Sequence, residues 1–205
     1  MTAANKQLSK TNQERIDLSD QLMFRAAIDL ILEKGTEKTT LKEVGEKAGY
    51  SRGLAGYRFG SKSGLFSFVL QKLGDYWLRD LTKVSQDKKG LDAILASTKR
   101  HYELFEEQPN NAKVFYILWF QVAGVDKEFQ ELILKINQRR QEDVKQWILQ
   151  DTGLSHKHQD AEVIASYFNS ALNGMIYQWF LNPNDLQSLK KSHDDLSHII
   201  TTLLA

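Results

Sequence analysis

The sequence predicts an all-α protein, and three observations lead to this prediction. Apolar residues recur at three- and four-residue spacing along nearly the whole chain of 205 residues, whereas alternation of the β type is hard to find. Only two prolines occur, Pro109 and Pro183. Hydrophobic residues make up 41% of the chain and charged residues 26%, which is ordinary for a globular protein with a sizeable core.

The first helix is marked by a start and a stop signal. Thr11 with Glu14, or alternatively Ser19, is suited to cap its N-terminus, and Gly35 after Lys34 is a C-terminal cap. The chain is expected to be ordered from about residue 15. One apolar stripe runs along this helix and consists of Leu22, Met23, Ala26, Ala27, Leu30 and Ile31.

Two short helices follow and are joined by a tight turn. Thr40 and Glu43 form a capping box that opens the second helix, and Gly49 ends it. Ser51 caps a third helix that runs to about Phe59. This pattern predicts a helix-turn-helix, whose second helix enters the DNA major groove.

The charge distribution agrees with DNA binding but does not require it. The net charge of the whole chain is +1, yet residues 38–62 contain six basic side chains and two acidic ones. A locally basic end on a neutral protein is typical of a DNA-binding face, although an ordinary mixed surface gives the same count.

Several side chains of the two short helices suit DNA contacts. Lys42 lies in the first turn of the second helix, where the helix dipole also attracts phosphate. Arg52 is able to bind guanine bidentately, and Leu54 to touch a thymine methyl group. Tyr57 and Arg58 are able to hold phosphates. The alternative is a small surface helix in an α-bundle.

Two glycines inside the third helix need a reason. Gly53 and Gly56 each cost about 1 kcal/mol of helix propensity relative to alanine. Close approach of the helix backbone to DNA, or to a neighbouring helix, explains why they are tolerated.

The stretch from Met23 to Phe66 resembles the DNA-binding domain of the TetR family of bacterial one-component regulators. The likeness includes the Ala-Ala pair of the first helix, the threonine-rich cap, and the segments Ala48-Gly49, Ser51-Arg52-Gly53 and Ser61-Lys62. By position, the resemblance implies DNA contacts by Thr40, Lys42, Ser51, Arg52, Gly53, Leu54, Tyr57, Arg58 and Lys62. The chain departs from the family at Ala55-Gly56, where Leu-Tyr is common. This difference affects which operator sequence the chain is expected to bind, more than DNA binding itself.

The resemblance implies two domains. Residues 1–66 form the N-terminal tail and the DNA-binding domain, and residues 67–205 form a helical ligand-binding and dimerisation domain. Apolar periodicity and helix-breaking residues predict where the remaining helices lie. A fourth helix runs from Ser61 to a break at 87–90, and further helices cover 91–107, 112–123, 128–149, 159–181 and the stretch from 186. Between them we expect a turn at 109–111, a helix stop at Gly124 and a loop at 151–158.

The helix over 159–181 has two apolar faces and is therefore expected to be buried on two sides. One face contains Ile164, Phe168, Leu172, Met175 and Trp179; the other contains Val163, Tyr167, Ala171 and Ile176. This helix and the last one resemble the pair that forms a four-helix dimer bundle in the family. The predicted homodimer interface consists of Phe168, Leu172, Met175, Trp179, Leu196 and Ile200.

A pocket for a small apolar or aromatic effector is implied between the middle helices. An aromatic lining also suits a flat or cationic molecule, although the same side chains serve equally well as ordinary core. The candidate lining residues are Tyr102, Phe105, Tyr116, Trp119, Phe120, Trp147, Tyr167 and Gln178.

Enzymatic and metal chemistry find little support. No catalytic set and no phosphate-binding glycine loop is legible from spacing. Asp195-x-x-His198 lacks the second copy that a di-iron bundle needs. The absence of cysteine excludes disulfides and iron–sulfur sites, and no apolar run approaches the roughly 18 residues of a membrane span.

The sequence thus predicts a cytoplasmic bacterial protein without metal or cofactor, associated with the nucleoid when it is bound to DNA. We expect a homodimeric regulator that represses transcription until a small effector releases it from a palindromic operator. The alternative is a helical ligand-binding or interaction protein that does not bind DNA.

Overall fold

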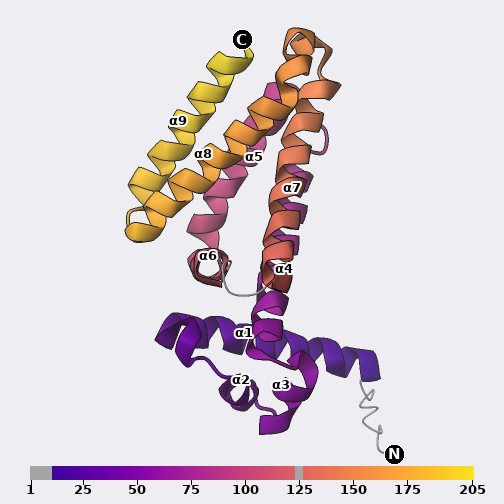
Figure 1. Cartoon of the computed structure of the whole chain (residues 1–205), viewed down its shortest axis with the longest axis vertical. Helices are drawn as coiled ribbons and strands as arrows, with labels where there is room; N and C mark the ends of the chain where they lie inside the picture. Colours follow the sequence, from indigo (N-terminus) through magenta and orange to yellow (C-terminus); the bar gives the residue numbers. More distant parts are fainter. Residues whose placement is uncertain (1–10, 123–126) are drawn as a thin grey trace, which may run out of the picture. The chain divides into compact units, whose positions relative to one another are not determined.

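The computed structural model describes residues 11–122 and 127–205, which contain helices and no strand (Figure 1). The predicted all-α fold is confirmed. The predicted tail over residues 1–10 and the helix stop at Gly124 lie outside the described residues. The helices are α1 (Asn12–Lys38), α2 (Leu41–Lys47), α3 (Arg52–Phe59), α4 (Lys62–Ser85), α5 (Gly90–Glu107), α6 (Pro109–Val122), α7 (Lys127–Gln150), the 3-10 helix η1 (Thr152–Asp160), α8 (Ala161–Leu181) and α9 (Leu186–Leu204).

The chain divides into two compact units, Met1–Leu65 and Phe66–Ala205, and α4 runs through the division. In the first unit, α1 begins with the predicted capping box: the Thr11 amide donates to the Glu14 carboxylate at 2.6 Å, and the Glu14 amide donates to the Thr11 hydroxyl at 3.2 Å. Gly35 interrupts α1 with a φ of 81°, as predicted, but the chain then adds one more turn before Thr39.

The core of the first unit joins α1 to the two short helices. It contains the buried side chains Met23, Ala27, Ile31, Val44, Ala55 and Leu65. The turn between α2 and α3 is tight, because a methyl group on Gly45 would lie 3.1 Å from the carbonyl oxygen of Ser51. The helix-turn-helix geometry therefore depends on Gly45, a residue to which the sequence pattern gives no role.

In the second unit, α8 packs against α7 and α9, and α5 packs against α7 and α9 (Figure 1). Two predicted irregular segments are helical. Pro109 was predicted to lie in a turn but is the first residue of α6. Its missing N–H costs nothing there, because the first N–H groups of a helix have no partner within the helix. The predicted loop over 151–158 is the 3-10 helix, which begins where Asp151 accepts a hydrogen bond from the Gly153 amide at 3.0 Å.

A buried hydrogen-bond chain crosses this unit from α6 through α5 to α9. His193 Nδ1 lies 2.8 Å from the Leu189 carbonyl oxygen, so Nδ1 carries the proton and Nε2 is an acceptor. His101 Nδ1, at 2.9 Å, then donates to His193, and its free Nε2 accepts from the Tyr116 hydroxyl at 3.2 Å. Every ring nitrogen is satisfied while both histidines are neutral.

The two histidines predict a loss of stability in acid. Burial lowers the pKa of His193 to about 4, and burial together with the neighbouring His193 lowers the pKa of His101 well below its ordinary value. In the unfolded chain both bind protons near pH 6.5, so the stability they contribute is complete above pH 6.5 and falls as the pH drops. For His193 alone, the loss between pH 6.5 and 4 is about 3 kcal/mol. Urea unfolding at several pH values measures it.

Two histidines on α9 provide a matched comparison. His193→Gln should flatten the acid limb of the pH–stability curve, whereas His198→Gln, at an exposed position on the same helix, should leave it unchanged. Equal slopes in the two variants would contradict a buried, neutral His193.

Candidate functional site

Helix α3 presents an exposed face with little polar character. Tyr57 is 90% exposed, and Gly53, four residues earlier, lies on the same face and is also exposed. Leu54 is half-buried, and Ser51 is exposed and makes no side-chain cap. Arg52 begins the helix, but its side chain lies outside the described part of the chain.

The glycines of α3 are not required by packing within the chain. A methyl group added at Gly53 or at Gly56 would meet no atom within 4 Å. Intramolecular helix packing therefore does not explain them, at least among the described residues, and the other explanation is approach by a separate molecule. Gly45 and Gly64 differ, because a Cβ there would crowd the Ser51 and Phe59 carbonyl groups respectively.

The start of α2 has the predicted capping geometry. The Thr40 hydroxyl accepts from the Glu43 amide at 3.3 Å, and it donates to the Glu43 carboxylate at 2.6 Å. Lys34 reaches the same carboxylate at 2.5 Å, and this hydrogen bond lowers the pKa of Glu43. Thr40 and Lys42 are both exposed, and among the described residues Lys42 has no ion-pair partner.

Arg58 is engaged within the chain instead of being free for phosphate. Its Nε lies 2.9 Å and its Nη2 lies 2.7 Å from the two carboxylate oxygens of Asp20 on α1. This bidentate bond raises the pKa of Arg58 and ties α3 to α1. The predicted phosphate contact of Arg58 therefore competes with this bond, and positioning of α3 is a second role for the side chain. Lys62 is also partly committed, because its amine donates to the Glu37 carbonyl oxygen at 2.5 Å.

Asp20→Asn tests this role of Arg58. If Arg58 positions α3, breaking the bond from either side destabilises the first unit by about 1–2 kcal/mol and weakens DNA binding. If Arg58 instead served phosphate, Asp20→Asn would release it and remove a negative charge, and DNA binding would strengthen. Thermal unfolding and DNA affinity of Asp20→Asn and Arg58→Gln separate the two roles.

Acidic residues of α1 also neutralise part of the basic excess seen in the sequence. Lys47 lies 2.5 Å from Glu33 and 3.7 Å from Asp29, and the bond to Glu33 raises the pKa of Lys47. Arg58 is paired with Asp20. Among the side chains of this stretch that the structure describes, Lys38 and Lys42 are the exposed basic ones without an ion-pair partner.

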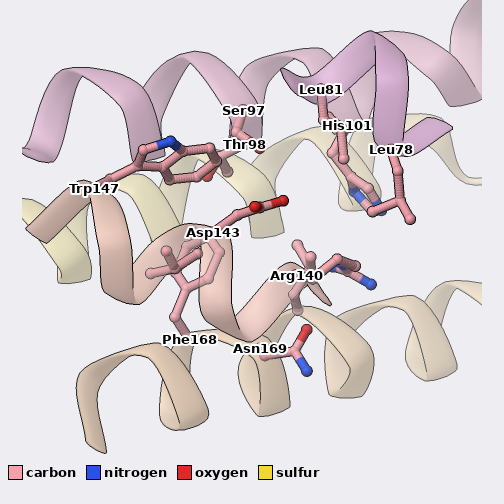
Figure 2. Close-up of a pocket in the computed structure, with 12 residues that line it drawn as sticks. Leu78, Leu81, Ser97, Thr98, His101, Arg140, Asp143, Trp147, Phe168 and Asn169 are labelled. Carbon is pink, nitrogen blue, oxygen red and sulfur yellow. The ribbon is translucent and has the colours of Figure 1, made fainter. Parts of the chain in front are cut away.

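The second unit contains a cavity with about 420 Å³ of unfilled space between α4, α5, α7 and α8 (Figure 2). The cavity is narrow. Apolar and polar side chains both line it: Leu78, Leu81, Ser97, Thr98, His101, Arg140, Asp143, Val144, Trp147, Phe168, Asn169 and Leu172.

The predicted pocket residues are mostly elsewhere. Trp147 lines the cavity, as predicted. Tyr167 and Gln178 project from the exposed side of α8, so they cannot line an interior pocket. The remaining five belong to a cluster of aromatic rings packed around Trp77, Phe115, His193, Tyr177 and Trp179: Tyr102, Phe105, Tyr116, Trp119 and Phe120.

The predicted dimer-interface residues are also misplaced. Phe168, Leu172, Trp179, Leu196 and Ile200 are buried inside one chain, and Met175 packs against the same core. Side chains that already fill the core of a monomer cannot form the contact surface of a dimer. Other apolar residues of α8 and α9 are exposed, and we call them the α8–α9 face: Val163, Tyr167, Ala171, Leu181, Ile199 and Leu203.

Comparison with known proteins agrees with this geometry. The sequence pattern of bacterial regulatory proteins of the tetR family matches residues 24–68, which include α2, α3 and the start of α4. Residues 24–68 are thus similar to the DNA-binding region of the tetR family.

Solved structures share the fold of this chain at low sequence identity. A transcriptional regulator from Rhodococcus sp. RHA1 is 22% identical, with 90% of this chain and 96% of that one covered and a TM-score of 0.76. SmeT, the repressor of the Stenotrophomonas maltophilia multidrug efflux pump SmeDEF, is 16% identical (90% and 89% covered; TM-score 0.72). NalD, the secondary repressor of the MexAB-OprM efflux pump in Pseudomonas aeruginosa, is 18% identical (92% and 96%; 0.70). SmeT is also known in complex with triclosan.

Two further findings concern other kinds of site. Within residues 11–122 and 127–205, no helix combines the length and apolar character needed to cross a bilayer. No group of three or more His, Asp or Glu side chains in the described chain is arranged to hold a metal ion.

Proposed function

We propose that this chain is a TetR-family regulator that binds an operator through the exposed face of α3 and represses transcription there. The observation that carries the proposal is the combination of a 90% exposed tyrosine, Tyr57, with two glycines that no contact of the chain itself requires. Glycines inside a helix cost stability in the free protein, and an almost fully exposed tyrosine contributes no packing there. Both become useful when a DNA duplex lies against α3.

The contacts are divided between phosphates and bases. Thr40 and Lys42 lie at the exposed N-terminus of α2, and with Tyr57 they serve phosphates. Ser51, Arg52, Gly53 and Leu54 begin α3 and face base edges in the major groove. Lys62 contributes to phosphate binding only to the extent that its bond to Glu37 allows.

Two copies of the chain pair through the α8–α9 face. Tyr167 is 72% and Leu181 65% exposed, and both lie on the side of α8 that faces away from the core. A second copy covers these side chains by a two-fold contact of the same surface with itself. Pairing also places two α3 helices on one duplex, as a palindromic operator requires, since a single short helix reads few bases.

A small organic effector binds the cavity of the second unit and lowers operator affinity. The cavity is enclosed by four helices and is too narrow for such a molecule without movement of its lining, so binding and conformational change are coupled. The complex of SmeT with triclosan, in a protein of the same fold, supports a small-molecule effector.

Mobility shift with the DNA upstream of the chain's own gene tests the function. We expect a retarded complex that competitor DNA of unrelated sequence displaces poorly. If no genomic fragment is bound at low salt, the protein is a helical ligand-binding or interaction protein instead.

Lys42→Ala should weaken binding to all DNA sequences alike. Removal of one phosphate contact reduces the slope of log affinity against log salt by about 1. Lys83→Ala, which removes an exposed lysine of α4 in the second unit, is the matched control and should leave the slope unchanged. Fluorescence anisotropy over a salt series measures both. A change in base preference with Lys42→Ala would contradict its assignment to phosphate.

A further inference from the structure

The cavity of the second unit contains a guanidinium that lacks a counter-charge. Arg140 projects from α7 toward the space between α5 and α8, where His101 and Asn169 also line the cavity (Figure 2). Its Nη2 atom is buried and has no hydrogen-bond partner among the described residues. The guanidinium does bond to the Tyr116 hydroxyl, but this group is neutral, since burial raises the pKa of Tyr116 to about 12.

The other charged group in the lining does not supply the missing counter-charge. Asp143 lies on the same helix, but its carboxylate is bound to Arg139 Nε at 3.0 Å. His101 is held neutral by the hydrogen bonds to Tyr116 and His193. The lining formed by the described residues therefore carries one uncompensated positive charge, that of Arg140.

A buried guanidinium lowers the stability of the folded chain unless a counter-charge pairs with it. A buried charge without a partner destabilises the folded chain, and a packed apolar side chain would remove that cost. Arg140 occupies a core position of α7, four residues from Ile136 and four from Val144, both of which are buried. Helical periodicity thus predicts an apolar side chain where arginine stands, and a use for the charge explains the exception.

We propose that the effector is an organic carboxylate, with its carboxylate bound to Arg140 and its apolar body against Trp147, Phe168 and Leu172. This assignment rests on the proposed function, in which the cavity is the effector site. A guanidinium presents parallel N–H donors that match a carboxylate. The unpaired Asn169 Oδ1 in the same lining adds an acceptor for a hydroxyl or amide of the ligand. This replaces the flat or cationic molecule that the aromatic residues alone indicate, since a cation would meet Arg140.

A second narrow void also borders Arg140. This void of about 260 Å³ shares Leu78, Leu81, His101 and Arg140 with the cavity. Arg140 thus borders both voids, and a modest shift of the side chains between them joins the two spaces.

Acid and amide pairs test the proposal, because they differ in charge but hardly in shape. The probes are phenylacetate with phenylacetamide, benzoate with benzamide, and octanoate with octanamide, titrated into the full chain with calorimetry and tryptophan fluorescence as readouts. We expect at least one acid to bind about tenfold or more tightly than its amide, as for a charge-assisted hydrogen bond. Equal affinity within every pair, or binding by no acid, overturns the proposal.

Variants test whether the charge of Arg140 is what distinguishes an acid from its amide. Arg140→Gln should abolish the preference for the acid, and Arg140→Lys should retain only part of it, whereas Lys135→Gln, an exposed charge removed from the same helix, should retain it fully. An acid preference that survives in folded Arg140→Gln overturns the assignment. The wild-type acid–amide comparison stands even if Arg140→Gln does not fold.

The same samples separate this inference from the function on which it rests. Operator DNA binding is measured by anisotropy with and without each acid. DNA binding without acid binding overturns the carboxylate assignment alone. Acid binding through Arg140 without DNA binding at low salt overturns the proposed regulator and leaves a carboxylate-binding protein.

Discussion

Tyr167→Asp should convert the protein from a dimer to a monomer and abolish tight operator binding. On the α8–α9 face the substitution places two carboxylates, one from each copy, in a contact that excludes water. Burial of unpaired like charges and loss of two aromatic anchors raise the dimer dissociation constant by about 10²–10³-fold. Operator affinity falls with it, because each α3 helix must then bind its half-site alone. Analytical ultracentrifugation and anisotropy measure the two effects.

Two controls make this result specific. Leu134→Asp puts the same charge at another exposed apolar position, on α7, and should leave the dimer intact. Leu172→Ala, in the core beneath the α8–α9 face, should lower the free energy of unfolding by about 2–5 kcal/mol. A dimer that persists in Tyr167→Asp would show that the chain pairs through another surface.

Gly53→Ala should stabilise the free protein and yet weaken its binding to DNA. A methyl group at Gly53 meets no atom of the described residues within 4 Å, so only the gain in helix propensity remains, about 1 kcal/mol. On DNA the same methyl group stands between the helix backbone and the groove, and the loss of close approach costs about tenfold in affinity. Thermal unfolding and anisotropy should therefore change in opposite directions.

Gly56→Ala is the matched variant. Gly56 has the same open surroundings, but it is less exposed than Gly53 and lies three residues further along the helix. We expect a similar gain in stability and a smaller loss of DNA affinity. If Gly53→Ala stabilises the protein and binds DNA unchanged, α3 does not approach DNA through this face.

The fold followed from the sequence where signals were local. The capping residues Thr11 and Thr40 and the glycine Gly35 fix helix ends through contacts within a few residues, and the boundaries of α2 and α3 were predicted closely. Pro109 shows the limit of such signals, because proline is compatible with both a turn and the first position of a helix.

Which surface meets which partner did not follow from the sequence. Helix α8 has two apolar sides, and periodicity detects both but does not tell which one the chain's own core covers. Phe168 and Leu172 proved to be core, while Val163 and Tyr167 on the other side are exposed. The deciding contacts come from α5, α7 and α9, which lie far away in the sequence.

Long-range pairing also decided the roles of two arginines. Arg58 appeared free because its partner, Asp20, lies 38 residues away on α1. Arg140, by contrast, left a readable signal: it interrupts the apolar stripe of α7 between Ile136 and Val144. A charged residue at a core position indicates a polar site. The pattern of aromatic residues does not reveal such a site.

Selection of genomic fragments by the purified protein tests the central claim most directly. Fragments of the genome that encodes this chain are bound at low salt, recovered and sequenced. The proposed function predicts enrichment of a few sites that share an inverted repeat, and loss of this enrichment with Arg52→Ala. Recovery of no enriched fragment, or of fragments without a common motif, would contradict a sequence-specific regulator that reads DNA with α3.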